Sequence, residues 1–166
     1  MITLGIDPGS RRTGWGVVHL EGSSARAVDY GVIRLSERLP LAERLHRIYD
    51  ELAEILRIVG PPRVFLESIF HHKNAQSALV LGHARGVAIL AAACAGAEVG
   101  EISPAEVKRA VTGHGRADKH QVQQMVKILL GLSAPAAADA SDALAVAFAG
   151  AVVAKSPLAA AKRGVR

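Results

Sequence analysis

Three apolar, β-prone runs lie within the first 34 residues and are separated by two short turns. They span residues 2–7, 14–20 and 27–34, with Pro8-Gly9 after the first run and Gly22-Ser23-Ser24 after the second. Strands joined by such short turns pair as antiparallel neighbours, because parallel strands need a long crossover connection. The chain is therefore predicted to begin with an antiparallel meander.

Beyond residue 34 the pattern changes to helices that alternate with short strands. Apolar residues from Leu41 to Leu56 recur at helical spacing, and Ser103-Pro104 supplies the N-cap and first residue of a later helix. The predicted helices span residues 40–58, 75–95, 104–112, 118–131 and 139–154, and the remaining strands span 63–67 and 97–102. This order predicts an α/β fold in which helices cover both faces of a mixed five-stranded sheet.

The 166 residues suffice for one domain with a full core, and no linker rich in Pro, Gly or Ser divides them. We expect one domain over residues 1–154 and a basic, mobile tail over 155–166. No uninterrupted apolar run reaches the roughly 18 residues of a membrane span, the start lacks the features of a signal peptide, and Cys94 is the only cysteine. These features predict a cytoplasmic protein without membrane association.

The net charge of +5 is distributed unevenly along the chain. Residues 1–107 hold 11 basic and 12 acidic side chains, whereas residues 108–166 hold 9 basic and 3 acidic ones, so the two parts carry −1 and +6. Two of those three acids are Asp139 and Asp142. A basic surface around an acidic pocket suits a polyanionic substrate handled through metal ions. Ordinary solvated lysines and arginines are the alternative explanation.

Four carboxylates stand where strands should end and where the last helix should begin. Asp7 and Glu67 close two apolar runs, and Asp139 and Asp142 are three residues apart on one helical face. If the two strands are parallel neighbours, the side chains of Asp7 and Glu67 reach the same sheet edge. Two carboxylates about 5 Å apart repel by roughly 3 kcal/mol at an effective dielectric of about 20, so such a cluster requires cations. The pattern predicts a site for hard divalent metal ions.

Each acid also has an ordinary explanation when it is taken alone. Asp7 can serve as a turn residue before Pro8, Asp139 as a helix N-cap and Asp142 as a solvated side chain. Glu67 is harder to explain in this way, because Glu is a poor strand residue.

Several residues near these acids are candidates for contacts with nucleic acid. Phe70 follows the fourth strand directly and either stacks on an unpaired base or belongs to the core. Each basic candidate either contacts a phosphate or is simply solvated. These candidates are Arg11, Arg12, Lys73, Lys108, Arg116 and Lys119. The glycines at positions 9, 14 and 16 are expected to let backbone approach closely near Asp7.

Four ordered blocks resemble the RuvC family of Holliday junction resolvases. They are GIDPGSRRTGWGVV at 5–18, LESIFHHKNAQSALVLGHARGVAIL at 66–90, PAEVKRAVTGHGRADKHQVQQMV at 104–126 and ADASDALAVA at 138–147. The segment GIDPG alone is a weak signal, because an Asp-Gly turn after a first strand also occurs in actin-like kinases, but four blocks in order are specific. The resemblance implies a ribonuclease H-like fold.

The resemblance also implies roles for individual residues. Asp7, Glu67, Asp139 and Asp142 match catalytic acids that hold Mg²⁺ or Mn²⁺, with two ions per site, and some members carry His in place of Asp139. Phe70 matches an aromatic residue that stacks at the junction, and Lys108 and Lys119 match lysines near the scissile phosphate. The implied activity is paired symmetric nicking of four-way DNA junctions in recombination and repair, leaving 5′-phosphate and 3′-hydroxyl ends.

The implied partners are four-way junction DNA, a second copy of the chain and a branch-migration motor of the RuvA–RuvB type, in the bacterial cytoplasm. The predicted helix 75–95 is more apolar than one buried face requires, so subunit contact and burial within the monomer both suit it. Three rival functions share parts of the pattern: an actin-like ATP-binding fragment, a junction-binding protein without catalysis, and a ribonuclease H-like nuclease that cuts RNA in hybrids.

Overall fold

A mixed five-stranded sheet runs through the centre of the molecule. The computed structural model describes residues 1–60, 63–68 and 75–155. The strand order is β3-β2-β1-β4-β5, with bounds Ile2–Asp7 for β1, Arg12–Glu21 for β2, Ser24–Arg34 for β3, Arg63–Glu67 for β4 and Val99–Ile102 for β5. The first three strands are antiparallel neighbours, whereas β1, β4 and β5 run parallel. The predicted meander and mixed sheet are confirmed.

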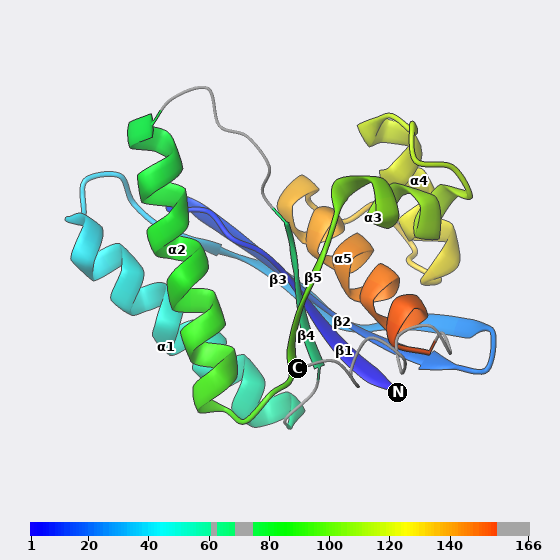
Figure 1. Ribbon diagram of the computed structural model, residues 1–166, viewed down its shortest axis with the longest axis horizontal. Coiled ribbons are helices and arrows are strands. Elements are labelled where there is room, and N and C mark those ends of the chain that lie inside the picture. Colours follow the sequence, from blue (N-terminus) through cyan, green and yellow to red (C-terminus); the bar gives the residue numbers. More distant parts are fainter. Residues whose placement is uncertain (61–62, 69–74, 156–166) are drawn as a thin grey trace, which may run out of the picture.

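Helices cover both faces of this sheet (Figure 1). Helices α1 (Leu41–Val59) and α2 (Ala75–Cys94) pack on one face, around a core that includes Leu4, Ile48 and Leu66. Helices α3 (Pro104–Thr112), α4 (Lys119–Leu129) and α5 (Ala138–Lys155) pack on the other face, around Val18 and Leu144. The sheet therefore separates two cores, and α5 lies directly on β1 and β2.

Local sequence signals account for the starts of two helices. The side chain of Ser103 caps α3 and forms a capping box with Glu106, with a proline in the first turn, as predicted from Ser103-Pro104. Asp118 forms the same kind of capping box with Gln121 and so places Lys119 in the first turn of α4.

Several element boundaries differ from the sequence prediction. Strands β2 and β3 extend beyond the expected 14–20 and 27–34, because their backbones stay paired from Arg12↔Arg34 to Glu21↔Ser24 whatever the polarity of the side chains. Arg12, predicted in a turn, is therefore the first residue of β2. Lys155, predicted to begin the tail, is the last residue of α5, and its ammonium donates a hydrogen bond to the carbonyl oxygen of Gly22.

Glycines bring α5 into backbone contact with the sheet. A Cβ atom on Gly14 would lie 2.0 Å from the carbonyl oxygen of Asp139, and one on Gly5 would lie 2.1 Å from that of Ala143. A Cβ on Gly16 would lie 2.8 Å from the Leu144 side chain, whereas one on Gly9 would meet its own loop at the carbonyl oxygen of Arg12. The close approach predicted for Gly14 and Gly16 is confirmed, and Gly5 was not anticipated.

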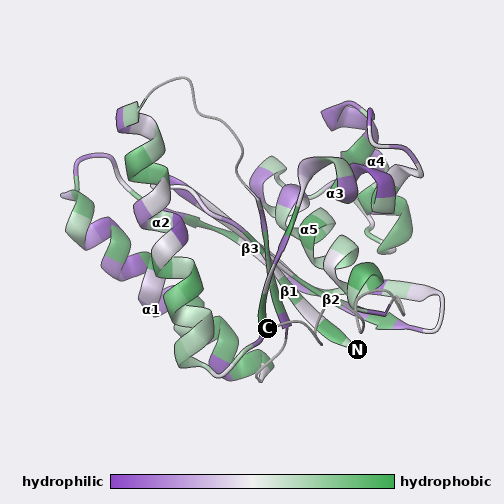
Figure 2. Cartoon of the chain, in the orientation of Figure 1, coloured by the Kyte–Doolittle hydropathy of each residue, from purple (hydrophilic) through white to green (hydrophobic). Residues whose placement is uncertain are grey.

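Helix α2 is apolar on more than its buried face. Much of it is hydrophobic or neutral, whereas α1 shows hydrophilic residues along one side (Figure 2). Leu79 and Leu90 are 66% and 54% exposed. By length and composition α2 is the one helix among the described residues that is able to cross a membrane, with 22% of its apolar window buried, and a single match of this kind is weak evidence for a span.

Candidate active site

The first two acids meet because their strands are parallel neighbours. Ile6 of β1 pairs with Leu66 of β4, so Asp7 and Glu67 follow that pair at the same edge of the sheet. Both carboxylates are partly buried where the strands end. The strand pairing on which the sequence argument depended is thus present.

The other two acids come from the start of α5. The helix begins at Ala138, so Asp139 lies within its first turn rather than at the N-cap position. Asp142 follows three residues later on the same side of the helix. The backbone contact between Asp139 and Gly14 holds this end of α5 over the strand that pairs with Asp7.

Two lysines share a cavity of about 280 Å³ with three of the acids. Lys108 of α3 and Lys119 of α4 line it together with Asp7, Glu67 and Asp142, and apolar side chains such as Val107 and Val122 complete the wall. The ammonium of Lys119 lies 2.7 Å from a carboxylate oxygen of Asp142. Asp139 does not line this cavity; its carboxylate lies 3.9 Å from the guanidinium of Arg12.

The electrostatics show that the four acids form one cluster. Burial, followed by the charges of Asp142, Glu67 and Asp139, raises the pKa of Asp7 to about 7, while Lys119 opposes the shift. Burial and then Asp142 raise the pKa of Glu67, against the lysines and Arg85. The hydrogen bond to Asp142 raises the pKa of Lys119. The ionised cluster thus lacks enough positive charge around it.

These residues fit a hard divalent cation by the chemistry of their donors. All four supply carboxylate oxygens, which Mg²⁺ and Mn²⁺ prefer, and the raised pKa of Asp7 marks a place where added positive charge is favourable. Within the described ranges no three acid, His or Cys side chains already form one coordination set. The Lys119 ammonium neutralises part of the cluster through Asp142.

Arg85 of α2 supports the site and was not found by sequence reasoning. One guanidinium nitrogen donates a 2.7 Å hydrogen bond to the carbonyl oxygen of Glu67, and another lies 2.6 Å from the carboxylate of Glu101 on β5. The side chain is only 12% exposed. It therefore fixes the ends of two adjacent strands. A basic residue inside an apolar helix was the only available signal.

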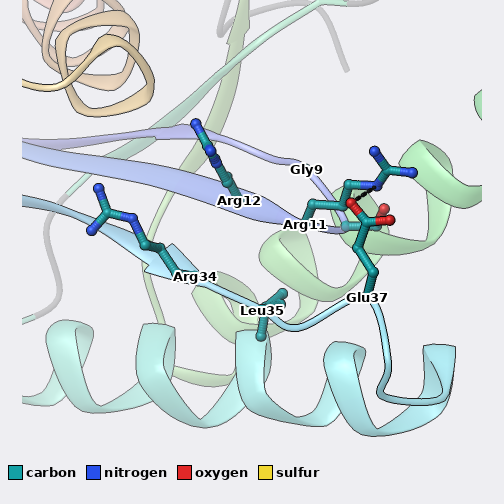
Figure 3. A pocket seen from close by; sticks show the side chains of 7 residues that line it. Gly9, Arg11, Arg12, Arg34, Leu35 and Glu37 are labelled. Carbon is teal, nitrogen blue, oxygen red and sulfur yellow. Dashed lines mark ion pairs between the residues drawn. The ribbon is translucent and has the colours of Figure 1, made fainter.

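The remaining candidates occupy different places. Arg11 and Arg12 line a separate groove beside the acids (Figure 3), and Arg11 forms a 3.0 Å ion pair with Glu37. Arg116 is exposed in the connection between α3 and α4 and does not line the acidic cavity. Phe70 and Lys73 lie outside the described residues.

Comparison with known proteins gives a consistent result across the chain. The family model described as "Crossover junction endodeoxyribonuclease RuvC" matches residues 3–150. A protein of that name from Halorhodospira halophila is 51% identical over 163 residues, covering 98% of this chain and 97% of the relative. Another from Syntrophotalea carbinolica is 53% identical over 148 residues, covering 89% and 92%.

A solved structure is similar over almost the same length. The chain superposes on T. thermophilus RuvC in complex with a Holliday junction substrate with a TM-score of 0.89 and 37% sequence identity, covering 93% of this chain and 95% of that one. This similarity confirms the ribonuclease H-like fold that the family resemblance implied.

Proposed function

This chain belongs to the RuvC family of crossover junction endodeoxyribonucleases, and we infer that it resolves four-way Holliday junctions by hydrolysing DNA phosphodiester bonds. The observation that carries this function is the acidic cluster: Asp7, whose pKa is raised to about 7 by burial and by three other acids, shares one cavity with Glu67, Asp142 and two lysines. An acidic centre with a cationic wall is suited to a metal-assisted attack on a phosphate diester.

We propose that Asp7, Glu67, Asp139 and Asp142 hold the metal on which nucleases of this family depend. Mg²⁺, with Mn²⁺ able to substitute and two ions per site, is the assignment that best suits four carboxylates. Bound there, such ions would lower the pKa of a coordinated water and stabilise the charge on the leaving 3′-oxygen. The products would carry 5′-phosphate and 3′-hydroxyl ends.

The protein's own cations have a separate task in this proposal. Lys108 lines the cavity opposite the acids, where its ammonium can bind a non-bridging oxygen of the scissile phosphate. Lys119, held by Asp142, keeps the phosphate and the acids at a fixed spacing. A single general base accounts for only about 10²–10⁴-fold of rate, so these preorganised charges must share in stabilising the transition state.

We propose a homodimer in which a second copy covers the exposed side of α2. Leu79 and Leu90 are eleven residues apart, which places them on one side of the helix. Gly82 and Gly86 lie between them with open space where a side chain would be. Two copies related by a two-fold axis would present two acidic sites to a junction that needs two symmetric nicks.

The rest of the assignment follows the family resemblance. Residues 1–154 would form a single nuclease domain acting in the bacterial cytoplasm, together with a branch-migration motor of the RuvA–RuvB type. Phe70 would stack on bases at the junction, and Lys73, Arg11, Arg12 and Arg116 would contact the DNA backbone.

A three-substrate assay tests this function. The protein is incubated with a synthetic four-way junction, a linear duplex and an RNA–DNA hybrid, each with Mg²⁺ and with EDTA. Symmetric nicking of the junction alone, lost in EDTA and in Asp7→Asn, is the expected result. Cleavage of the hybrid would favour the rival ribonuclease activity, and unchanged nicking by Asp7→Asn would remove that residue from the site.

A further inference from the structure

A basic groove lies beside the acidic cluster, on the side away from Lys108 and Lys119. It has a volume of about 620 Å³ and is formed by the β1–β2 loop, the end of β3 and the segment that follows. Arg11, Arg12 and Arg34 contribute three positive charges to its lining, and Glu37 contributes the one negative charge. The guanidinium of Arg12 also lies 3.9 Å from Asp139, so the groove borders the acids.

Two of these arginines stand directly opposite each other. Arg12 begins β2, Arg34 ends β3, and the two residues are cross-strand partners. Their side chains extend to the same side of the strand pair (Figure 3). Like charges at opposed positions of a strand pair are destabilising. Arg12 has a 3.9 Å ion pair with Asp139, whereas the Arg34 side chain has no hydrogen bond or ion pair with any residue in the described part of the chain.

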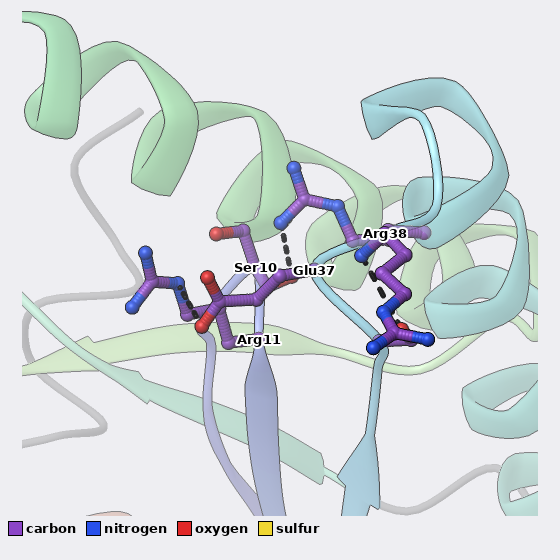
Figure 4. Close-up of polar contacts among 6 residues, drawn as sticks. Ser10, Arg11, Glu37 and Arg38 are labelled. Carbon is purple, nitrogen blue, oxygen red and sulfur yellow. Dashed lines mark hydrogen bonds and ion pairs between the residues drawn. The ribbon is translucent and has the colours of Figure 1, made fainter.

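The walls of the groove are fixed by contacts in which the side chains of Arg12 and Arg34 take no part. The guanidinium of Arg44 on α1 donates a 2.9 Å hydrogen bond to the carbonyl oxygen of Ser10, and Glu37 holds Arg11 (Figure 4). The backbone N–H of Leu35 donates a 3.0 Å bond to the carbonyl oxygen of Arg11 and ties the loop to the end of β3. The groove is thus built before any ligand arrives.

We propose that Arg12 and Arg34 form a clamp for a phosphate of the DNA backbone, on the arm that leaves the scissile position. An anion between two opposed guanidinium groups turns their repulsion into two charge-assisted contacts. Among the described residues, no aromatic side chain lines the groove to stack on a base. Its recognition therefore depends on backbone charge rather than base sequence. The proposal deepens, and rests on, the proposed DNA substrate.

Binding measured as a function of salt tests the clamp. Labelled linear duplex and labelled four-way junction are titrated in EDTA with the wild type, Arg12→Ala, Arg34→Ala, the double variant and Arg34→Lys. The matched control is Arg26→Ala. It removes an exposed arginine from β3, the strand of Arg34, at the end distant from the groove. Thermal unfolding without DNA accompanies each titration. Arg34→Ala should unfold at the same or a higher temperature, because it removes the opposed charge.

For Arg34→Ala we expect about tenfold weaker binding to both DNAs and a salt slope lower by about 1, the value for one lost phosphate contact. The double variant should lose little more than either single variant, because both arginines hold the same phosphate. Arg34→Lys should keep the salt slope but bind more weakly, because an ammonium lacks the guanidinium fork. Arg26→Ala should match the wild type.

Other outcomes overturn the proposal in distinguishable ways. If wild-type protein binds DNA and Arg34→Ala binds with the same affinity and slope, the clamp is wrong and the proposed nuclease function is untouched. If the wild type binds neither DNA, the proposed function fails and the clamp fails with it. If inorganic phosphate raises the unfolding temperature of the wild type but not of Arg34→Ala while DNA binding stays equal, the groove is a site for a small anion instead.

Discussion

The guanidinium of Arg85, in the middle of α2, donates a 2.7 Å hydrogen bond to the backbone carbonyl oxygen of Glu67. A second nitrogen of the same group lies 2.6 Å from the carboxylate of Glu101 on the neighbouring strand. One nearly buried side chain thus joins a helix on one face of the sheet to the strand end that carries a candidate metal ligand. The position of the Glu67 carboxylate depends on this bond, because residue 67 is the last of β4.

We expect Arg85→Ala to slow junction nicking about 10–100-fold, the usual cost of losing a group that orients a metal ligand. The loss should appear in kcat and in the Mg²⁺ concentration needed for half-maximal rate, with little change in junction affinity. Arg85→Lys should recover only part of the rate, because an ammonium cannot reproduce the fork that reaches both Glu67 and Glu101.

Arg63→Ala is the matched control for this experiment. Arg63 is at the opposite end of β4 and forms a 3.0 Å ion pair with Glu98. The Arg63→Ala protein should nick the junction at the wild-type rate. Equal rates for Arg85→Ala and Arg63→Ala would show that the Glu67 carboxylate needs no support from α2.

The pKa of Asp7 predicts an unusual pH dependence of stability. Burial, followed by the charges of Asp142, Glu67 and Asp139, raises this pKa from 3.8 to about 7 in the folded protein. Between those values the folded state binds more protons than the unfolded state, so the contribution of Asp7 to stability falls as the pH rises. Above about pH 7 the destabilisation is fully developed.

Asp7→Asn should therefore unfold at a higher temperature than the wild type in EDTA at about pH 8, and the gain should shrink towards about pH 5. A gain of about 4–8 °C corresponds to roughly 2 kcal/mol for a chain of this size. Glu51→Gln, on the exposed side of α1, should show no such pH-dependent gain. A difference between Asp7→Asn and the wild type that stays constant with pH would contradict the raised pKa.

In the proposed site, Lys119 and a metal ion would compete for the same carboxylate. The lysine ammonium lies 2.7 Å from Asp142, and the charges of Asp142, Asp7 and Asp139 favour its protonated form. We expect Lys119→Met to bind Mg²⁺ more tightly than the wild type yet to nick junctions at least about tenfold more slowly, because it lacks a cation beside the phosphate.

The metal affinity of Lys119→Met can be read from the rise in unfolding temperature with added Mg²⁺, and its activity from single-turnover nicking. Lys127→Ala, two turns further along α4, removes a positive charge at a distance from the acids and should change neither quantity. Weaker Mg²⁺ binding by Lys119→Met would mean that this lysine assists the metal rather than competing with it.

The exposed leucines of α2 predict how the dimer can be broken. Leu79→Glu combined with Leu90→Glu should convert the protein to a monomer in light scattering, because two carboxylates would be buried without partners at the interface. The double variant should also lose paired nicking of a single junction, and this loss should be larger than any decrease in the fraction of folded protein explains. Ile128→Glu, at a 69% exposed position on α4, should leave the mass unchanged. A dimer that survives the double substitution would exclude this side of α2.

The sequence allowed prediction of those parts of the fold that depend on local signals. Ser103, Pro104 and Glu106 define the start of α3 in sequence as they do in space. The β2–β3 pair was predicted too short, because backbone pairing continues past the apolar runs to Arg12 at one end and to Glu21 and Ser24 at the other. Hydrophobic alternation reports the buried part of a strand and carries no information about its solvated ends.

Those residues of the site that a strand end or a helical spacing positions could be predicted, whereas contacts between distant elements could not. Asp7 and Glu67 could be placed together because each ends a strand, and Asp139 and Asp142 because they are three apart on a helix. Arg85 could not be linked to Glu67 by any spacing rule, because the contact spans 18 residues between elements. The like-charged pairing of Arg12 with Arg34 depends on strand register, which neither residue reveals alone.

The backbone contacts of Gly5 and Gly14 with α5 bear on how loss-of-function variants of this enzyme would be distributed. At these two positions one added methyl group would meet a carbonyl oxygen of the helix at 2.1 Å and 2.0 Å, so α5 would have to shift together with Asp139 and Asp142. A saturation mutagenesis screen for inactive variants should therefore recover substitutions of Gly5 and Gly14 as often as substitutions of the acids themselves. Such hits would report misplaced carboxylates, in a protein whose chemistry is otherwise intact.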